Sequence, residues 1–240
     1  DKSVQYDMLC YMTMGNDQTE FKNAVKQWLK SHKLDYQWMA ERCGVWIRTI
    51  YFDLADETAV TAAVQDILKE KLPVDILVNN AAADDETGVD TIEKITAKII
   101  DDTFAVNVRG SILMMREMIN HRGEYGRIIN IASMYGLVGN TEIPTIAYHS
   151  SKGGVVNFTR AAAAELAKYN ITVNCICPGY FYTELTTSVL DTERFQDFAK
   201  SHVPMQRYGK EGELNAGAIF LSSEEASYVT GIVLPIDGGY

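Results

Sequence analysis

From residue 45 onward, segments with the apolar pattern of strands alternate with segments that have the pattern of helices. Short runs rich in β-branched, aromatic or other apolar residues predict strands at residues 45–54, 74–83, 126–133, 171–179 and 231–240. Longer segments with helical apolar spacing predict helices at residues 56–71, 91–120, 147–169, 190–201 and 211–223. Strands that alternate with helices imply right-handed crossovers and a parallel sheet covered on both faces. We therefore predict a single doubly wound α/β domain over residues 1–240.

Composition and charge limit the class of protein. The 240 residues are 47% apolar, enough for one well-cored domain. No run of about 18 apolar residues is present that could cross a membrane. The net charge is −10 and is uneven, since residues 1–52 carry +1 and the remainder carries −11. An acidic main body argues against nucleic-acid binding, and the shift in charge sets the N-terminal fifth apart.

The cysteines indicate neither a disulfide framework nor a metal site. Cys10, Cys43, Cys175 and Cys177 are few for this length, and the last two lack the partners of a zinc motif. We therefore expect no metal and a reducing, cytoplasmic environment.

Polar or turn-forming residues follow four of the predicted strands. They are Asp53, residues 79–83, Ser133 and Pro178–Gly179. In open parallel α/β sheets, ligands bind beyond the carboxyl ends of the strands. Each residue alone could simply form the turn that follows its strand. Together they indicate the rim of one cleft.

Tyr148 and Lys152 stand four residues apart in a predicted helix, so their side chains share one face. An ammonium group beside a phenol favours the phenolate and lowers the phenol pKa from its ordinary value of about 10. Such a tyrosine can exchange a proton with a hydroxyl or carbonyl oxygen near neutral pH. Alone, the pair is more typical of a surface contact on a helix.

Six motifs in order resemble those of the short-chain dehydrogenase/reductase family. They are residues 79–82 (NNAA), Asn107, Ser133, Tyr148-x-x-x-Lys152, residues 178–183 (PGYFYT) and residues 230–239 (TGIVLPIDGG). The resemblance covers roughly residues 45–240 and implies a Rossmann-like fold. The sequence departs mildly from the family pattern at three places. Ala82 replaces the usual glycine, Pro235 replaces the usual residue before Ile-Asp-Gly-Gly, and the Ser133–Tyr148 interval is slightly long. The last suggests an enlarged loop on the substrate side.

The resemblance implies four catalytic residues. Tyr148 would donate or accept the proton, and Lys152 would lower its pKa and hold the nicotinamide ribose. Ser133 would orient the substrate oxygen, and Asn107 would hold a water that links Lys152 to solvent. Two of them have a structural alternative, because Ser133 could cap the strand end and Asn107 could merely bond backbone.

The resemblance also implies a nicotinamide cofactor, NAD or NADP, with a slight preference for NAD. The residues that would hold it are Thr13, Gly15, Asp53, Leu54, Asn79, Ala81, Tyr148, Lys152, Pro178, Gly179 and Thr183. Asp53 would approach the adenine ring, although it could instead cap the helix that begins at residue 56. Asn79 would lie on the adenosine side. Pro178, Gly179 and Thr183 would flank the nicotinamide.

The family pattern fails in the first 52 residues. Residues 8–32 match its first strand, phosphate loop and helix best, and residues 34–40 would be the second strand. Thr13 and Gly15 survive, but Gln18 and Glu20 stand where further glycines belong. A carboxylate at that place would repel a diphosphate.

Residues 36–52 have a second interpretation, as a helix-turn-helix that binds DNA. Ala40, Gly44 and Ile50 have the required spacing. The strand is favoured, because residues 45–52 offer few polar side chains that could read bases and they lead directly into Asp53.

The sequence therefore predicts an enzyme that interconverts a secondary alcohol and a ketone with NAD or NADP. Residues 147–160 and 178–185 look most like sugar-acid and polyol dehydrogenases such as gluconate 5-dehydrogenase, and 3-oxoacyl-carrier-protein reductases share much of the pattern. Similar family members form dimers and tetramers, so we expect a homo-oligomer with a small-molecule substrate. The alternative is a cofactor-free scaffold or regulator, should residues 1–52 not complete the nucleotide site.

Overall fold

The computed structural model describes residues 11–12, 52–69, 74–83, 91–121, 126–140, 145–181, 190, 192–210 and 212–240. The strands in these ranges are β1 (Tyr11–Met12), β2 (Ile76–Asn79), β3 (Gly126–Ile131), β4 (Ile171–Pro178) and β5 (Val233–Ile236). The α-helices are α3 (Glu57–Leu68), α4 (Ala97–Phe104), α5 (Ser111–Asn120), α6 (Ile146–Leu166), α8 (Glu193–His202) and α9 (Asn215–Ser222). The shorter helices are the π-helical η1 (Ala105–Gly110) and the 3-10 helices η2 (Met134–Gly136), η3 (Ala167–Tyr169) and η4 (Glu224–Ala226).

The strands form one sheet in the order β1-β2-β3-β4-β5. β2 to β5 run parallel, with Asn79 opposite Asn130, and Pro178 opposite Ile236. Helices lie between consecutive parallel strands along the chain, because two parallel strands need a long crossover. The predicted parallel α/β sheet is confirmed for these four strands.

The prediction is wrong for the direction of the N-terminal strand. Residues 8–32 were expected to begin with the first strand of the parallel sheet, but Tyr11 and Met12 pair antiparallel with Leu77 and Ile76 of β2. An apolar run predicts a strand without giving its direction. The free edge of β2 can accept a short strand of either direction, since both make backbone hydrogen bonds.

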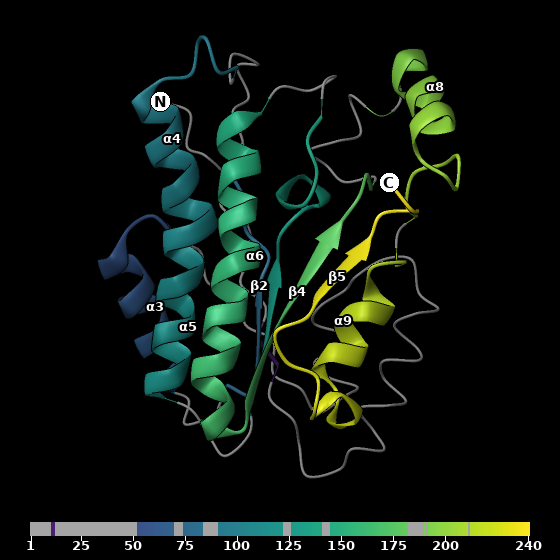
Figure 1. Cartoon of the computed structure of the whole chain (residues 1–240). Coiled ribbons are helices and arrows are strands. Elements are labelled where there is room, and N and C mark those ends of the chain that lie inside the picture. The colour runs from purple at the N-terminus through teal and green to yellow at the C-terminus, as the bar shows by residue number, and fades with distance from the viewer. Residues whose placement is uncertain are drawn as a thin grey trace.

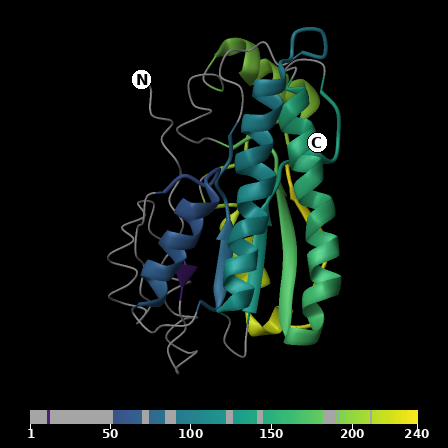
Figure 2. The same cartoon turned by 90° about the vertical axis from the view of Figure 1, so that its left-hand side faces the viewer.

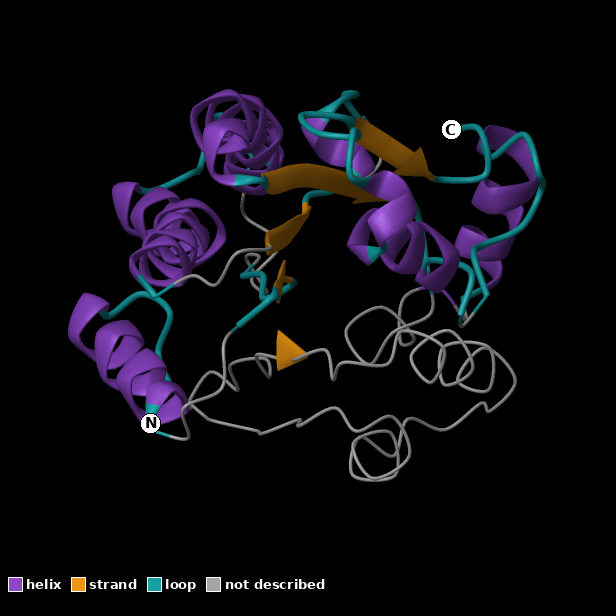
Figure 3. Ribbon diagram, turned by 90° about the horizontal axis from the view of Figure 1, so that it is seen from below, coloured by secondary structure: helices purple, strands orange, loops and turns teal. Residues whose placement is uncertain are grey.

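Helices cover both faces of the sheet. Figure 2 shows α3, the column of α4 and α5, and α6 next to one another on one face, and α9 lies on the other (Figure 1, Figure 3). Neighbouring residues of β3 point to opposite faces, so Ile128 packs with Val60 and Met114. Ile129 packs instead with Ile176 and Leu221. The core therefore lies in two layers, one on each side of the strands.

The helical segment predicted over residues 91–120 consists of three consecutive parts. Helix begins at Ala97 rather than residue 91, because the Thr96 hydroxyl caps α4 by accepting from Ile99 N at 3.2 Å. α4 then continues through the π-helical η1 into α5. π-helical turns inside helices often occur at functional sites, and η1 contains Asn107.

The other predicted helices agree with the structure to within a few residues, since α3, α6, α8 and α9 occupy the expected segments. The strand expected over residues 45–54 lies mostly outside the described residues, and Phe52 to Leu54 form no strand. No helix in the described ranges is long and apolar enough to cross a bilayer.

Candidate active site

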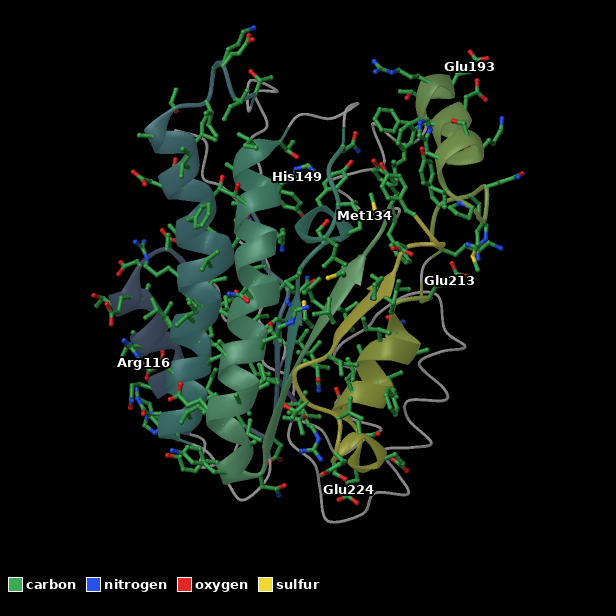
Figure 4. All side chains as sticks on the ribbon, in the orientation of Figure 1. Arg116, Met134, His149, Glu193, Glu213 and Glu224 are labelled. Carbon is green, nitrogen blue, oxygen red and sulfur yellow. The ribbon has the colours of Figure 1, made fainter. Side chains whose placement is uncertain are left out.

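Three of the four segments predicted to rim a cleft, those that follow β2, β3 and β4, come together at one edge of the sheet. The parallel register places the carboxyl ends of β2, β3, β4 and β5 at that edge. In Figure 1 the arrows of β4 and β5 point toward it, and α8 and the C-terminus lie beyond. Figure 4 labels Met134 of η2 and His149 of α6 in the same region. We therefore treat this edge as the candidate active site.

Tyr148 and Lys152 lie one turn apart in α6, as predicted. The Lys152 side chain is only 2% exposed, and its Nζ atom donates to the Ile131 carbonyl at the end of β3, at 2.9 Å. The same Nζ atom lies 5.5 Å from the centroid of the Tyr148 ring. A buried ammonium needs polar partners, and the Ile131 carbonyl fixes this positive charge beside the Tyr148 ring.

Ser133 stands directly beyond β3, where it caps η2. Its Oγ atom accepts from Tyr135 N at 3.2 Å, so the structural alternative, capping, does occur. A serine hydroxyl can accept and donate at once. Among the described residues the Ser133 hydroxyl donates to none, so its hydrogen is available to a ligand oxygen.

Asn107 connects α6 with the segment that follows β2. Its Oδ1 atom accepts from Ala83 N at 2.7 Å, and its Nδ2 atom donates to Ala83 O at 2.9 Å. Nδ2 also donates to Ser151 Oγ at 2.9 Å, and that hydroxyl in turn donates to Tyr148 O at 2.9 Å. The side chain thus does bond backbone, which was the structural alternative. Sequence reasoning missed Ser151.

Asp53 and Leu54 lie just before α3, whose first residue is Glu57. Asp53 Oδ1 accepts from Ala55 N at 2.7 Å, closing a local turn. The suggestion that Asp53 caps the following helix is wrong, because Asp56 does so by accepting from Thr58 N and Ala59 N. Oδ2 of Asp53 has no hydrogen bond to the described residues. Leu54 belongs to the apolar core.

Asn79 and Ala81 lie at the end of β2 and just after it. The Asn79 side chain is buried and points into the fold, where Nδ2 donates to Asn130 Oδ1 at 2.8 Å. Asn130 donates in turn to Thr159 Oγ1 at 2.9 Å. Ala81 packs against the core cluster. Any contact between Asn79 and a cofactor would therefore involve its backbone.

Pro178 ends β4, and Gly179 follows where β4 and β5 approach closely. Gly179 N donates to Ile236 O at 2.9 Å, and a Cβ atom on Gly179 would lie 2.6 Å from Asp237 Cα. Real Cβ atoms do not approach so closely, so the strand end requires glycine here. Thr13, Gly15 and Thr183 lie outside the described residues, as do residues 36–51 of the possible helix-turn-helix.

Sequence reasoning also missed an aromatic cluster at this edge. Tyr180 lies edge-on to Tyr135, Phe198, Tyr208 and Tyr240, with ring centroids between 5.6 and 6.1 Å. Burial raises the pKa of Tyr180 to about 12, and that of Tyr135 higher still. Both phenols are therefore neutral at physiological pH. The aromatic residues just after two strand ends were the available signal.

Cys175 and Cys177 lie beneath the site in β4 as free, buried thiols. Their sulfur atoms are 3.9 Å apart. The hydrogen bond from Cys177, ahead of the opposing effect of burial, lowers the pKa of the Cys175 thiol, whereas the same contact raises that of Cys177. No group of three or more histidine, cysteine or acidic side chains in the described ranges could hold a metal ion.

A parallel α/β sheet with a tyrosine, a buried lysine and a serine at its carboxyl edge defines an oxidoreductase of the short-chain type. Residues 24–240 match the family model described as Enoyl-(Acyl carrier protein) reductase. The chain belongs to the short-chain dehydrogenase/reductase family.

Curated relatives and solved structures place it among the family's dehydrogenases and reductases. It is 34% identical over 200 residues to gluconate 5-dehydrogenase of Gluconobacter oxydans, covering 82% of this chain and 75% of that protein. It is 34% identical over 209 residues to a 3-oxoacyl-acyl-carrier-protein reductase of Aquifex aeolicus, covering 84% and 79%. A gluconate 5-dehydrogenase from Burkholderia cenocepacia, solved with NADP and tartrate, superposes with a TM-score of 0.73 at 31% identity, covering 78% and 72%.

Proposed function

We propose that this protein interconverts a secondary alcohol and a ketone with NAD or NADP, and that Tyr148 transfers the proton. The observation that carries the proposal is the position of Lys152, whose ammonium group is held by Ile131 O at 2.9 Å and lies 5.5 Å from the Tyr148 ring centroid. A fixed positive charge beside a phenol favours its deprotonated form, which is the form that acts as a base.

The residues at the carboxyl edge fit a dinucleotide. Asp53 has a carboxylate oxygen, Oδ2, that accepts no hydrogen bond from a described residue. This carboxylate would approach the adenine ring of the cofactor. Lys152 would hold the nicotinamide ribose, and the Pro178–Gly179 turn would flank the nicotinamide. The bound cofactor would supply or accept the hydride.

The chain's own groups would handle the oxygen of the substrate. During reduction, Tyr148 would donate its hydroxyl proton to the carbonyl oxygen, and during oxidation it would take that proton back. The unused Ser133 hydroxyl hydrogen would donate to the same oxygen and polarise the carbonyl. Asn107 and Ser151 would act as positioning residues, because they tie the first turns of α6 to Ala83.

We propose a sugar acid or a polyol as the substrate. Two similar proteins are named gluconate 5-dehydrogenase, and the hydroxyl-rich cluster at the edge supports a polar substrate. The 3-oxoacyl-acyl-carrier-protein reductase is the competing relative. We further propose that the chain forms one cytoplasmic domain and assembles as a homo-oligomer, for which the exposed Ile100, Ile112 and Ile146 on the outer helices offer apolar surface.

The proposal is tested by titrating the full chain with NADH and with NADPH, in calorimetry or intrinsic tryptophan fluorescence, followed by assays of alcohol oxidation. We expect saturable binding of at least one cofactor and turnover of a hydroxylated substrate. Absence of binding of both at about 1 mM would refute the proposed oxidoreductase activity.

A further inference from the structure

Three polar side chains from separate segments meet beside Tyr148. The hydroxyl oxygens of Tyr135 and Tyr180 are 2.5 Å apart. Asn140 Nδ2 donates to Tyr180 Oη at 3.0 Å and also donates to Tyr135 Oη. The Tyr135 ring lies edge-on to Tyr148, with centroids 6.4 Å apart. We call Tyr135, Asn140 and Tyr180 the hydroxyl cluster, and it adjoins the proposed proton donor.

One phenol hydrogen of the hydroxyl cluster is left without an acceptor among the described residues. Each phenol carries one hydrogen, and both phenols stay protonated near neutral pH because burial raises their pKa values. One phenol donates to the other, and the phenol that accepts keeps its own hydrogen. Asn140 Nδ2 is a donor and cannot take it. In the described part of the chain nothing else accepts this hydrogen.

His149, which contacts the Tyr135 ring, adds an acceptor. Its ring stacks on the Tyr135 ring, with centroids 4.3 Å apart and planes 16° apart. Nδ1 lies 2.7 Å from the Thr145 carbonyl oxygen, which can only accept, and 3.0 Å from the Thr145 hydroxyl, so we assign the donor role of the ring to Nδ1. Nε2 therefore carries a lone pair, and this enclosed atom has no partner among the described residues.

Packing alone does not explain why the phenol hydrogen and the His149 Nε2 atom lack hydrogen-bond partners. Tyr208 is the contrasting case in the same aromatic cluster, because its hydroxyl donates to the backbone carbonyl of Phe195 and is fully used. A buried acceptor or donor without a partner costs free energy. A ligand that supplies the missing partners would recover it.

We infer that the hydroxyl cluster and His149 recognise a hydroxyl group of the substrate close to the reacting carbon. A hydroxyl group both accepts and donates, so it complements a free phenol hydrogen together with an imidazole lone pair. The inference rests on the proposed function and narrows its substrate to vicinally hydroxylated alcohols. An unhydroxylated acyl chain, as on a 3-oxoacyl thioester, would leave both groups unpaired, and sites built on hydrogen bonds reject such analogues.

The test compares cis-cyclopentane-1,2-diol and D-gluconate with cyclopentanol, which lacks the neighbouring hydroxyl. The wild-type enzyme should oxidise the hydroxylated substrates with the higher kcat/KM. The double variant Tyr135→Phe/Tyr180→Phe keeps both rings and removes both phenol hydrogens, so it should reduce this preference by about 10-fold or more. His149→Phe keeps the stacking on Tyr135, removes the acceptor, and should reduce the preference as well.

Tyr208→Phe is the matched control, since it removes a hydroxyl that is already paired, and it should leave the preference unchanged. Thermal unfolding and cofactor titration of each variant separate lost recognition from lost folding, and Asn140→Ala repeats the test without altering an aromatic ring. An unchanged preference in the folded Tyr135→Phe/Tyr180→Phe and Asn140→Ala variants overturns the inference, as does a wild-type enzyme that favours cyclopentanol. In both cases the oxidoreductase proposal survives, whereas turnover of none of the three substrates would count against that proposal itself.

Discussion

Asn107 connects η1 with the segment beyond β2 and with α6. It is 1% exposed and bonds both the N–H and the C=O of Ala83, while it also donates to Ser151. One side chain thus satisfies both backbone polar groups of Ala83, in the segment beyond β2. The motif with an asparagine in this helix was visible in the sequence, but the Ala83 and Ser151 partners depend on packing between segments far apart in the chain.

Asn107→Ala should destabilise the fold, because both polar groups of Ala83 lose their partner. Groups left unsatisfied in this way cost about 1–3 kcal/mol of unfolding free energy. Urea denaturation of the variant measures the loss. Asn157→Ala, at an exposed position of α6, is the control and should change stability by less than about 0.5 kcal/mol. Equal stability of the two variants would contradict the role assigned to Asn107.

At the scale of elements, a bidentate ion pair joins two residues of the connection between α8 and α9. Arg207 donates through both Nη atoms to the Glu213 carboxylate, each at 2.8 Å, and Lys210 N donates to Glu213 at 2.7 Å. The hydrogen bond from Arg207, followed by that from Lys210, lowers the pKa of Glu213 from 4.5 to about 2. Both side chains of the pair are exposed to solvent, which screens their attraction, so the pair adds little to stability.

The lowered pKa of Glu213 predicts a contribution to acid stability with a definite sign. The contribution is fully present above the unfolded-state pKa, near 4.5, and is lost as the pH falls toward about 2. Glu213→Gln should therefore reduce stability at pH 6 and have no effect near pH 2. Glu193→Gln, at the exposed start of α8 (Figure 4), is the control. A deficit of Glu213→Gln that persists unchanged at pH 2 would contradict this account.

Elements were predictable where local pattern decides them. The helices α3 and α6 and the strands β3 and β4 follow from apolar periodicity, turn residues and β-branched runs. Local pattern failed for strand direction at β1, which a hydrophobic run does not encode. It also missed the start of α4 at Ala97, although Thr96 is a good capping residue that the sequence displays.

At the scale of the whole molecule, the sheet assembles the site from distant segments. Parallel strands bring their carboxyl ends to one edge, so the positions of Ser133 and Gly179 were predictable from motif order. The contacts of the hydroxyl cluster were not, because Tyr135 and Tyr180 are 45 residues apart and meet only through the packing of η2 against the end of β4. The phosphate loop expected near Thr13 and Gly15 lies outside the described residues and stays a prediction.

The central claim is that Tyr148 transfers the proton, and one variant tests it most directly. Tyr148→Phe removes the hydroxyl and keeps the ring beside Lys152. We predict that turnover falls by about 100-fold or more, as for loss of a general acid–base group, while the affinity for NADH or NADPH stays within about threefold of wild type. A folded Tyr148→Phe enzyme that binds cofactor and retains wild-type turnover would contradict the account.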